Sequence, residues 1–227
     1  MILPRFEYYP WSIREKLMEN NVLSNYLLHF KAAGELFVSF DSLYDPYESF
    51  DVQYGNYLEV WHTKLEPSFL FQSFFPIEQS FLNNYFTLVL TSLDPDFERS
   101  LDVWINLSIM PQDVKLSDPA DFETEFKNKQ GIHGTRQTFN ATFDFKSGVN
   151  LVPYKQPKPQ KGSGDNRFVF LLFRQPSGAL PIERLKFRDR WGSKYNDHGV
   201  VDWADYYGLE PIAVNFFNSS YDKEDWF

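Results

Sequence analysis

The sequence contains no cysteine, which excludes disulfide bonds, thiolate nucleophiles and cysteine-ligated metal sites. Its four histidines lie far apart and show no spacing of the His-Glu-x-x-His kind, so we expect each to be structural or on the surface. No run approaches the roughly 20 consecutive apolar residues of a membrane-spanning helix. The opening residues resemble neither a secretory signal nor an arginine-rich presequence. We therefore predict a folded protein without metal, cofactor or transmembrane segment.

Basic residues are scarce relative to acidic ones. Lysine and arginine number 22 against 31 aspartates and glutamates, which gives a formal net charge of -9. A field of that sign repels phosphate backbones and anionic lipid surfaces, which argues against direct contact with nucleic acid. Neither a Gly-x-Ser-x-Gly elbow nor a P-loop is present, so the residues give no support to an enzyme.

Aromatic residues, in contrast, are abundant, with 24 Phe, 13 Tyr and 6 Trp among the 227 residues. A core of ordinary size does not need so many rings. Each exposed ring buries a large area against a partner at little conformational entropy cost, so a surplus is typical of surfaces that contact other proteins. The composition therefore favours a protein whose function depends on protein contacts.

Short runs rich in β-branched and aromatic residues, separated by Gly, Pro, Asn and Asp, predict a mostly β fold with one core. These runs are residues 34–40, 68–74, 85–91, 102–109, 166–173 and 210–217.

Helices are expected only at the periphery. Ser12 and Glu15 form a capping-box pattern that predicts a helix starting near Ser12 and ending at Asn20 and Asn21. Two shorter helices are expected at residues 182–187 and 202–207, the second ended by Gly208.

We divide the chain into an N-terminal extension (1–11), one domain (12–222) and a short tail (223–227). Within the domain, the polar stretch 117–149 is interpreted as an insertion loop with modest structure of its own.

The segment "KGSGDNRFVFLLFRQP", residues 161–176, resembles the Lys-Gly-[Ser/Thr]-Gly-x-His-Arg-[Tyr/Phe]-Val-[Phe/Trp] signature of the phosphatidylethanolamine-binding protein family. "YFTLVLT" is similar to the strand before the family's Asp-Pro-Asp-x-Pro-Ser signature, and "GLEPIAVNFF" resembles its closing strand. The likeness covers residues 12–222. It implies a single-domain antiparallel β-sheet sandwich with peripheral helices and a small pocket that takes phosphate or a phospholipid headgroup.

The resemblance also places the family's pocket positions on this chain, and most of them carry a different residue. The signature histidine falls on Asn166, and the aromatic hydroxyl two positions later falls on Phe168. A glycine of the preceding family turn falls on Lys158. The remaining positions of the predicted, degenerate anion pocket are Trp104, Asn106 in place of a second histidine, and Ser92, or Asp94 if the loop shifts by two residues.

Each of these changes removes a group that an anion needs. Two imidazoles become neutral amides and a hydroxyl donor becomes hydrocarbon. Asn166 and Asn106 could still line a weakened polar pocket, or they could satisfy each other and the nearby backbone, as buried polar groups usually do. The resemblance therefore implies that the loop has kept the family's backbone shape and that the pocket no longer binds phosphate or a phospholipid headgroup.

Two classes of function follow. The first is a non-enzymatic structural subunit of a larger, mitochondrial protein assembly, because "LVLTSLD" is similar to the variant found in the family's member in the mitochondrial large ribosomal subunit. In that case Trp226 and Phe227 in the tail are candidate anchors for partner subunits. The alternative is a soluble binder of an anion or lipid headgroup that inhibits a protease or regulates a kinase. We expect a mitochondrial location for the subunit and a cytoplasmic one otherwise.

Overall fold

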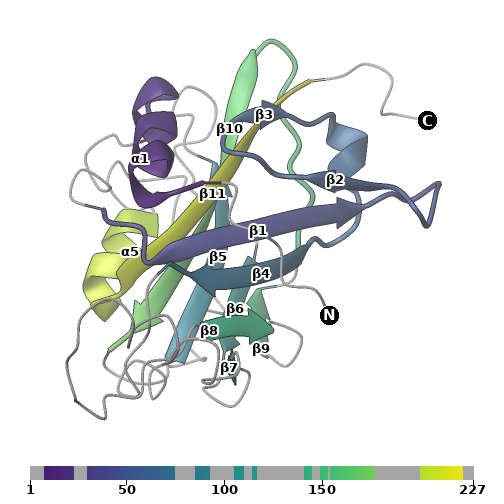
Figure 1. Cartoon of the computed structure of the whole chain (residues 1–227). Coiled ribbons are helices and arrows are strands. Elements are labelled where there is room, and N and C mark those ends of the chain that lie inside the picture. Colours follow the sequence, from purple (N-terminus) through teal and green to yellow (C-terminus); the bar gives the residue numbers. More distant parts are fainter. Residues whose placement is uncertain are drawn as a thin grey trace, which may run out of the picture.

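A computed structural model describes residues 8–22, 30–74, 85–92, 105–109, 114–116, 141–144, 149–152, 154–176 and 200–221. These residues form two β-sheets and two α-helices (Figure 1). The first sheet has the strand order β2-β1-β4-β8-β7, and the second has the order β3-β11-β10-β5-β6-β9. The predicted fold class, a mostly β sandwich with peripheral helices, is thereby confirmed.

The strands of the first sheet are β1 (Gly34–Asp41), β2 (Ser49–Asp51), β4 (Ser68–Ser73), β7 (Val114–Leu116) and β8 (Ala141–Asp144). Those of the second are β3 (Asn56–Tyr57), β5 (Tyr85–Ser92), β6 (Ile105–Ile109), β9 (Val149–Val152), β10 (Asp165–Gln175) and β11 (Glu210–Ser220). The pairs described are antiparallel except that β3 runs parallel to β11. In Figure 1, β1 and β4 cross in front of β5, β10 and β11.

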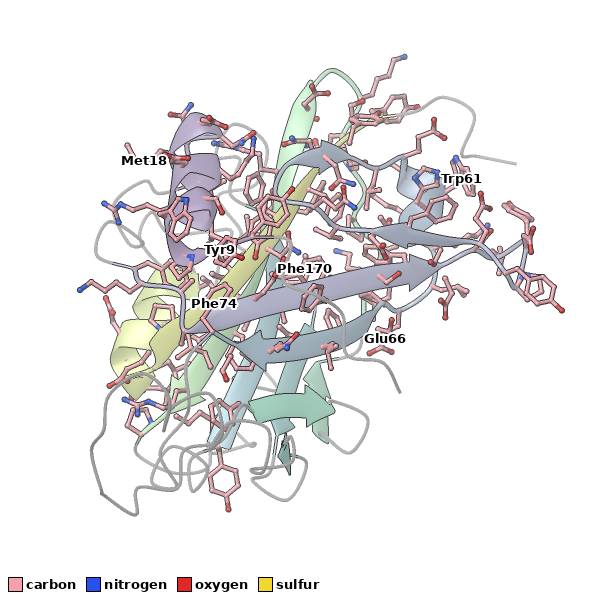
Figure 2. All side chains as sticks on the ribbon, in the orientation of Figure 1. Tyr9, Met18, Trp61, Glu66, Phe74 and Phe170 are labelled. Carbon is pink, nitrogen blue, oxygen red and sulfur yellow. The ribbon has the colours of Figure 1, made fainter. Side chains whose placement is uncertain are left out.

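The main core lies between the two sheets, where alternate residues of each strand point inward. Leu36, Val38 and Phe40 of β1 face Phe168, Phe170 and Leu172 of β10 among others, and all six are at most 2% exposed. Phe170 is labelled near the centre of the molecule in Figure 2. This burial of aromatic and aliphatic side chains is the main stabilising contribution to the sandwich.

A second apolar layer covers the outer face of the second sheet. Val169, Leu171 and Phe173, which alternate with the inward residues of β10, belong to one buried cluster with Ile13 and Leu17 of the helix α1 (Pro10–Glu19). Helix α5 (Val200–Tyr207) packs on the same face and ends before Gly208, whose φ is +61°. The predicted helix at 202–207 is therefore confirmed, starting two residues earlier. No helix among the described residues is long and apolar enough to cross a bilayer.

The start of α1 differs from the sequence prediction. The helix begins at Pro10, with Tyr9 as its N-cap, and Ser12 occupies the third helical position. The Ser12 hydroxyl donates to the carbonyl oxygen of Tyr9 and accepts from its N–H, both at 2.9 Å. The prediction that Ser12 caps the helix was wrong because Pro10, whose fixed φ suits the first helical turn, begins the helix before it.

Other predicted segments are partly or wholly outside the described residues. Strand β8 lies within the predicted insertion 117–149 and pairs with β4, so this part of the segment joins the first sheet. The rest of that segment, apart from Val149 in β9, lies outside the description, as do the predicted helix at 182–187 and the tail 223–227.

Candidate functional site

Two glycines shape the loop before β10. Gly162 and Gly164 have φ values of +86° and +72°, which glycine adopts without a steric cost. Between them, Ser163 closes a turn: its N–H donates to the carbonyl oxygen of Gln160 at 3.0 Å, and its hydroxyl donates to the same oxygen at 2.8 Å. This turn delivers the chain into β10 at Asp165.

Asn166 and Phe168 then lie two residues apart on the inward face of β10. The Asn166 side chain is 7% exposed, and its amide nitrogen donates to the Ser163 hydroxyl oxygen at 3.0 Å. Phe168 is 2% exposed, and its ring stacks on Phe217 with centroids 5.3 Å apart. The position of the expected hydroxyl is thus part of the hydrophobic core, and the amide is satisfied within the loop.

Ser92 and Ser219 are the nearest buried polar neighbours in the strand registers. Ser92, at the end of β5, pairs with Phe168, and Ser219 of β11 pairs with Asn166. Ser219 is fully buried and its hydroxyl has no hydrogen-bond partner among the described residues. The strand registers therefore place Ser92 beside Phe168 and Ser219, which belongs to no recognised motif, beside Asn166.

The other predicted pocket residues lie farther from Asn166 and Phe168 along the strands and loops, or lie outside the described residues. The backbone of Asn106 in β6 lies opposite Val89, three positions along β5 from Ser92. Lys158 is exposed on the loop before β10. Asp94 and Trp104, and the predicted anchors Trp226 and Phe227, lie outside the described residues.

Hydrogen bonds hold the start of the loop before β10, residues 154–156, against the 3-10 helix η1 (Val60–Thr63). Tyr154 donates its hydroxyl hydrogen to the carbonyl oxygen of Thr63, and the Gln156 amide donates to that of Val60 at 2.7 Å. Burial raises the pKa of the Tyr154 hydroxyl and the nearby Glu66 carboxylate raises it further, while the side chain of Thr63 has the opposite effect. These contacts join residues 91 and 96 positions apart, and no local sequence pattern indicates them.

Arg167, the signature arginine, points away from the inward face. Its guanidinium donates to the carbonyl oxygens of Asn20 and Asn21 at 2.9 and 3.1 Å, at the end of α1. A cation at this end of a helix interacts favourably with its partial negative charge. Arg167 therefore holds α1 against the second sheet.

The chemistry available at this end of the sandwich is limited. Among the described residues, the buried polar groups placed there are hydroxyls and an amide, which can bind a water or a neutral polar group but carry no charge. Over the described ranges, no set of three or more histidine, aspartate or glutamate side chains could hold a metal ion.

The described chain is a two-sheet sandwich in which a glycine-rich loop leads into β10 at Asn166 and Phe168. The chain belongs to the phosphatidylethanolamine-binding protein family, whose family model matches residues 49–217. The resemblance predicted from the sequence is therefore confirmed.

Individual relatives extend this comparison. The chain is 32% identical to the carboxypeptidase Y inhibitor of Saccharomyces cerevisiae over 201 residues, covering 83% of this chain and 84% of the relative. A crystal structure of carboxypeptidase Y inhibitor complexed with the cognate proteinase matches with a TM-score of 0.66 at 23% identity, over 94% of this chain and 97% of the other. The phosphatidylethanolamine-binding protein from Plasmodium vivax shares the fold, with a TM-score of 0.55 at 13% identity over 92% and 97% of the two chains.

Proposed function

We propose that this protein binds a peptidase and inhibits it through contacts with the peptidase surface. The observation that carries the proposal is the likeness to the carboxypeptidase Y inhibitor of Saccharomyces cerevisiae, which spans most of both chains. The surplus of aromatic side chains and the acidic charge support a role in protein contacts, as opposed to contacts with nucleic acid. The proposal corresponds to the protease-inhibitor alternative predicted from the sequence.

We also propose that the ancestral anion pocket no longer takes phosphate or a lipid headgroup. Phe168 fills the position of a hydroxyl donor and packs on Phe217, and the Asn166 amide is bonded to Ser163. Charge-assisted hydrogen bonds to phosphate are about twice as strong as neutral ones, so an amide and a ring retain little affinity. Inhibition should therefore not depend on a bound anion.

Hydrolysis of a short peptide by purified Saccharomyces cerevisiae carboxypeptidase Y tests the main proposal. Adding the chain should abolish hydrolysis near an equimolar ratio, and inorganic phosphate should leave the titration unchanged. An unrelated carboxypeptidase serves as the control and should keep its activity. Full hydrolysis by carboxypeptidase Y in the presence of excess chain would refute the proposal.

The other hypothesis from the sequence, a structural subunit of a mitochondrial assembly, makes a different prediction, and nothing in the comparisons above favours it. Native-gel migration of the tagged chain from a cell lysate separates the two. An inhibitor should migrate as a free chain of 26.9 kDa or with one peptidase. Co-migration with a very large particle would instead support the subunit.

A further inference from the structure

The tip of the β1–β2 hairpin, residues 42–48, carries large apolar side chains into solvent. Tyr47 is 98% exposed, Tyr44 71% and Leu43 45%. In Figure 1 this hairpin projects well beyond the two sheets on the side of β2. Rings so exposed contribute little to the stability of the fold, and their clustering on one projection is typical of an interaction surface.

The tip is held in a defined conformation by its polar groups and not by its rings. Ser42 donates its N–H to the carbonyl oxygen of Glu48 at 3.0 Å, and its hydroxyl oxygen accepts from the N–H groups of Tyr44 and Asp45, both at 3.3 Å. The Asp45 carboxylate accepts from the N–H of Tyr47 at 2.9 Å. A partner would therefore meet a preorganised loop, which lowers the entropy cost of binding.

The aromatic surface continues from the tip to η1. The ring of Tyr44 lies 6.0 Å from that of Trp61, and Trp61 lies edge-on to Phe50 at 5.2 Å. His62 stacks on Phe50 at 3.8 Å. Figure 2 labels Trp61 on η1, on the same side of the molecule as the hairpin. We call Leu43, Tyr44, Tyr47 and Trp61 the hairpin surface.

Acidic residues surround this surface. Residues 41–51 contain four exposed carboxylates, those of Asp41, Asp45, Glu48 and Asp51, and no lysine, arginine or histidine. On the η1 side, Glu59 accepts a hydrogen bond from the Trp61 indole, and exposed Lys64 and Glu66 follow. Ring faces beside carboxylates attract cations in two ways, through the ring quadrupole and through charge.

We infer that the hairpin surface docks a lysine- or arginine-bearing segment of a protein partner. Its cations lie on the Tyr44 and Trp61 rings and among the carboxylates of residues 41–51, and its apolar residues cover Tyr47 and Leu43. This inference stands independently of the proposed peptidase inhibition, because it rests on the charge and exposure of the hairpin and on its contact with Trp61.

Three variants of the full chain isolate the surface. Tyr44→Ser with Tyr47→Ser removes the rings, and the tip should keep its conformation because its hydrogen bonds use backbone, Ser42 and Asp45. Asp41→Asn with Glu48→Gln removes two charges without changing size. Tyr206→Ser is the matched control, since Tyr206 is a tyrosine of similar exposure, 63%, on α5. Circular dichroism checks that each variant is folded.

A random peptide library displayed on phage provides the probe. The wild-type chain selects peptides, and the Tyr44→Ser/Tyr47→Ser chain removes those that bind elsewhere. The recovered peptides should be enriched in lysine or arginine together with apolar residues. Their affinity should fall at least about tenfold in the ring variant, and about threefold, with a weaker salt dependence, in the charge variant. Tyr206→Ser should bind like the wild type.

Three results would overturn the inference. One is that no peptide distinguishes the wild type from the ring variant. Another is that the tip-dependent peptides show no excess of cationic residues, which would mean that apolar contact alone is recognised. The third is a dimer of the chain in sedimentation velocity that disappears in the ring variant, because the occupant would then be a second copy.

Discussion

Replacing Phe168 with alanine tests whether the predicted pocket position is now part of the core. The Phe168 side chain is 2% exposed and stacks on Phe217 at 5.3 Å. Truncating a buried phenylalanine to alanine costs about 3–5 kcal/mol through lost transfer energy and the cavity that remains. A stacked aromatic pair contributes about 0.5–1.5 kcal/mol of such a total. We therefore expect the free energy of unfolding to fall by about 4 kcal/mol.

Urea unfolding followed by far-UV circular dichroism measures this change. The midpoint should fall while the slope with urea stays constant, and the melting temperature should drop by about 10 °C for a chain of this size. Tyr44→Ala is the control, because Tyr44 is 71% exposed and its truncation should cost less than about 0.5 kcal/mol. A loss below about 1 kcal/mol for Phe168→Ala would show that the ring faces an open pocket and is not part of the core.

Three further changes test other parts of the structure. Asn215→Leu should lower the free energy of unfolding by about 3–5 kcal/mol in urea titrations. The buried Asn215 amide donates to the carbonyl oxygens of Leu36 and Val52 at 2.8 and 2.9 Å and accepts from the N–H of Tyr54 at 3.0 Å, and leucine can make none of these bonds. A loss under about 1 kcal/mol would contradict this expectation. Gly164→Ala should lower the free energy of unfolding by about 1 kcal/mol in the same titration, because alanine rarely adopts the φ of +72° found at Gly164. The space around Gly164 is open, so no steric clash adds to this cost. An unchanged midpoint would argue against a positive φ at this position. Burial raises the pKa of Tyr154 above its ordinary 10.0, so its contribution to stability is complete below that pH and is lost as the pH rises toward the folded pKa. Tyr154→Phe should therefore flatten the alkaline fall in melting temperature, and an identical pH profile would exclude this role.

Much of the fold follows from local sequence. The runs in β1, β5, β10 and β11 carry enough β-branched and aromatic residues to predict strands. Because β5, β10 and β11 are buried on both faces, their continuous apolar runs do not show which face meets the first sheet. The parallel strand β3 could not be predicted, because two residues carry no periodic pattern. The start of α1 was misplaced because Ser12 suits both the cap and the third helical position, and only Pro10 distinguishes them.

The part of the candidate site that lies on a single strand could be predicted from the sequence. Asn166 and Phe168 share a face because they are two positions apart in β10. Ser219 reaches the same place from β11, and Tyr154 reaches Thr63 across 91 positions, so only the tertiary pairing reveals them. Whether a polar residue is satisfied locally, as Asn166 is by Ser163, also depends on a loop geometry that composition does not specify.

Calorimetric titration of purified Saccharomyces cerevisiae carboxypeptidase Y with the full chain measures whether the two proteins bind and whether binding needs an anion. The titration is run in buffers with and without inorganic phosphate, and phosphate is also titrated into the chain alone. We expect saturable one-to-one binding of the peptidase, equal in both buffers, and no heat of phosphate binding below millimolar concentrations. Absence of peptidase binding, or binding that appears only with phosphate, would contradict this.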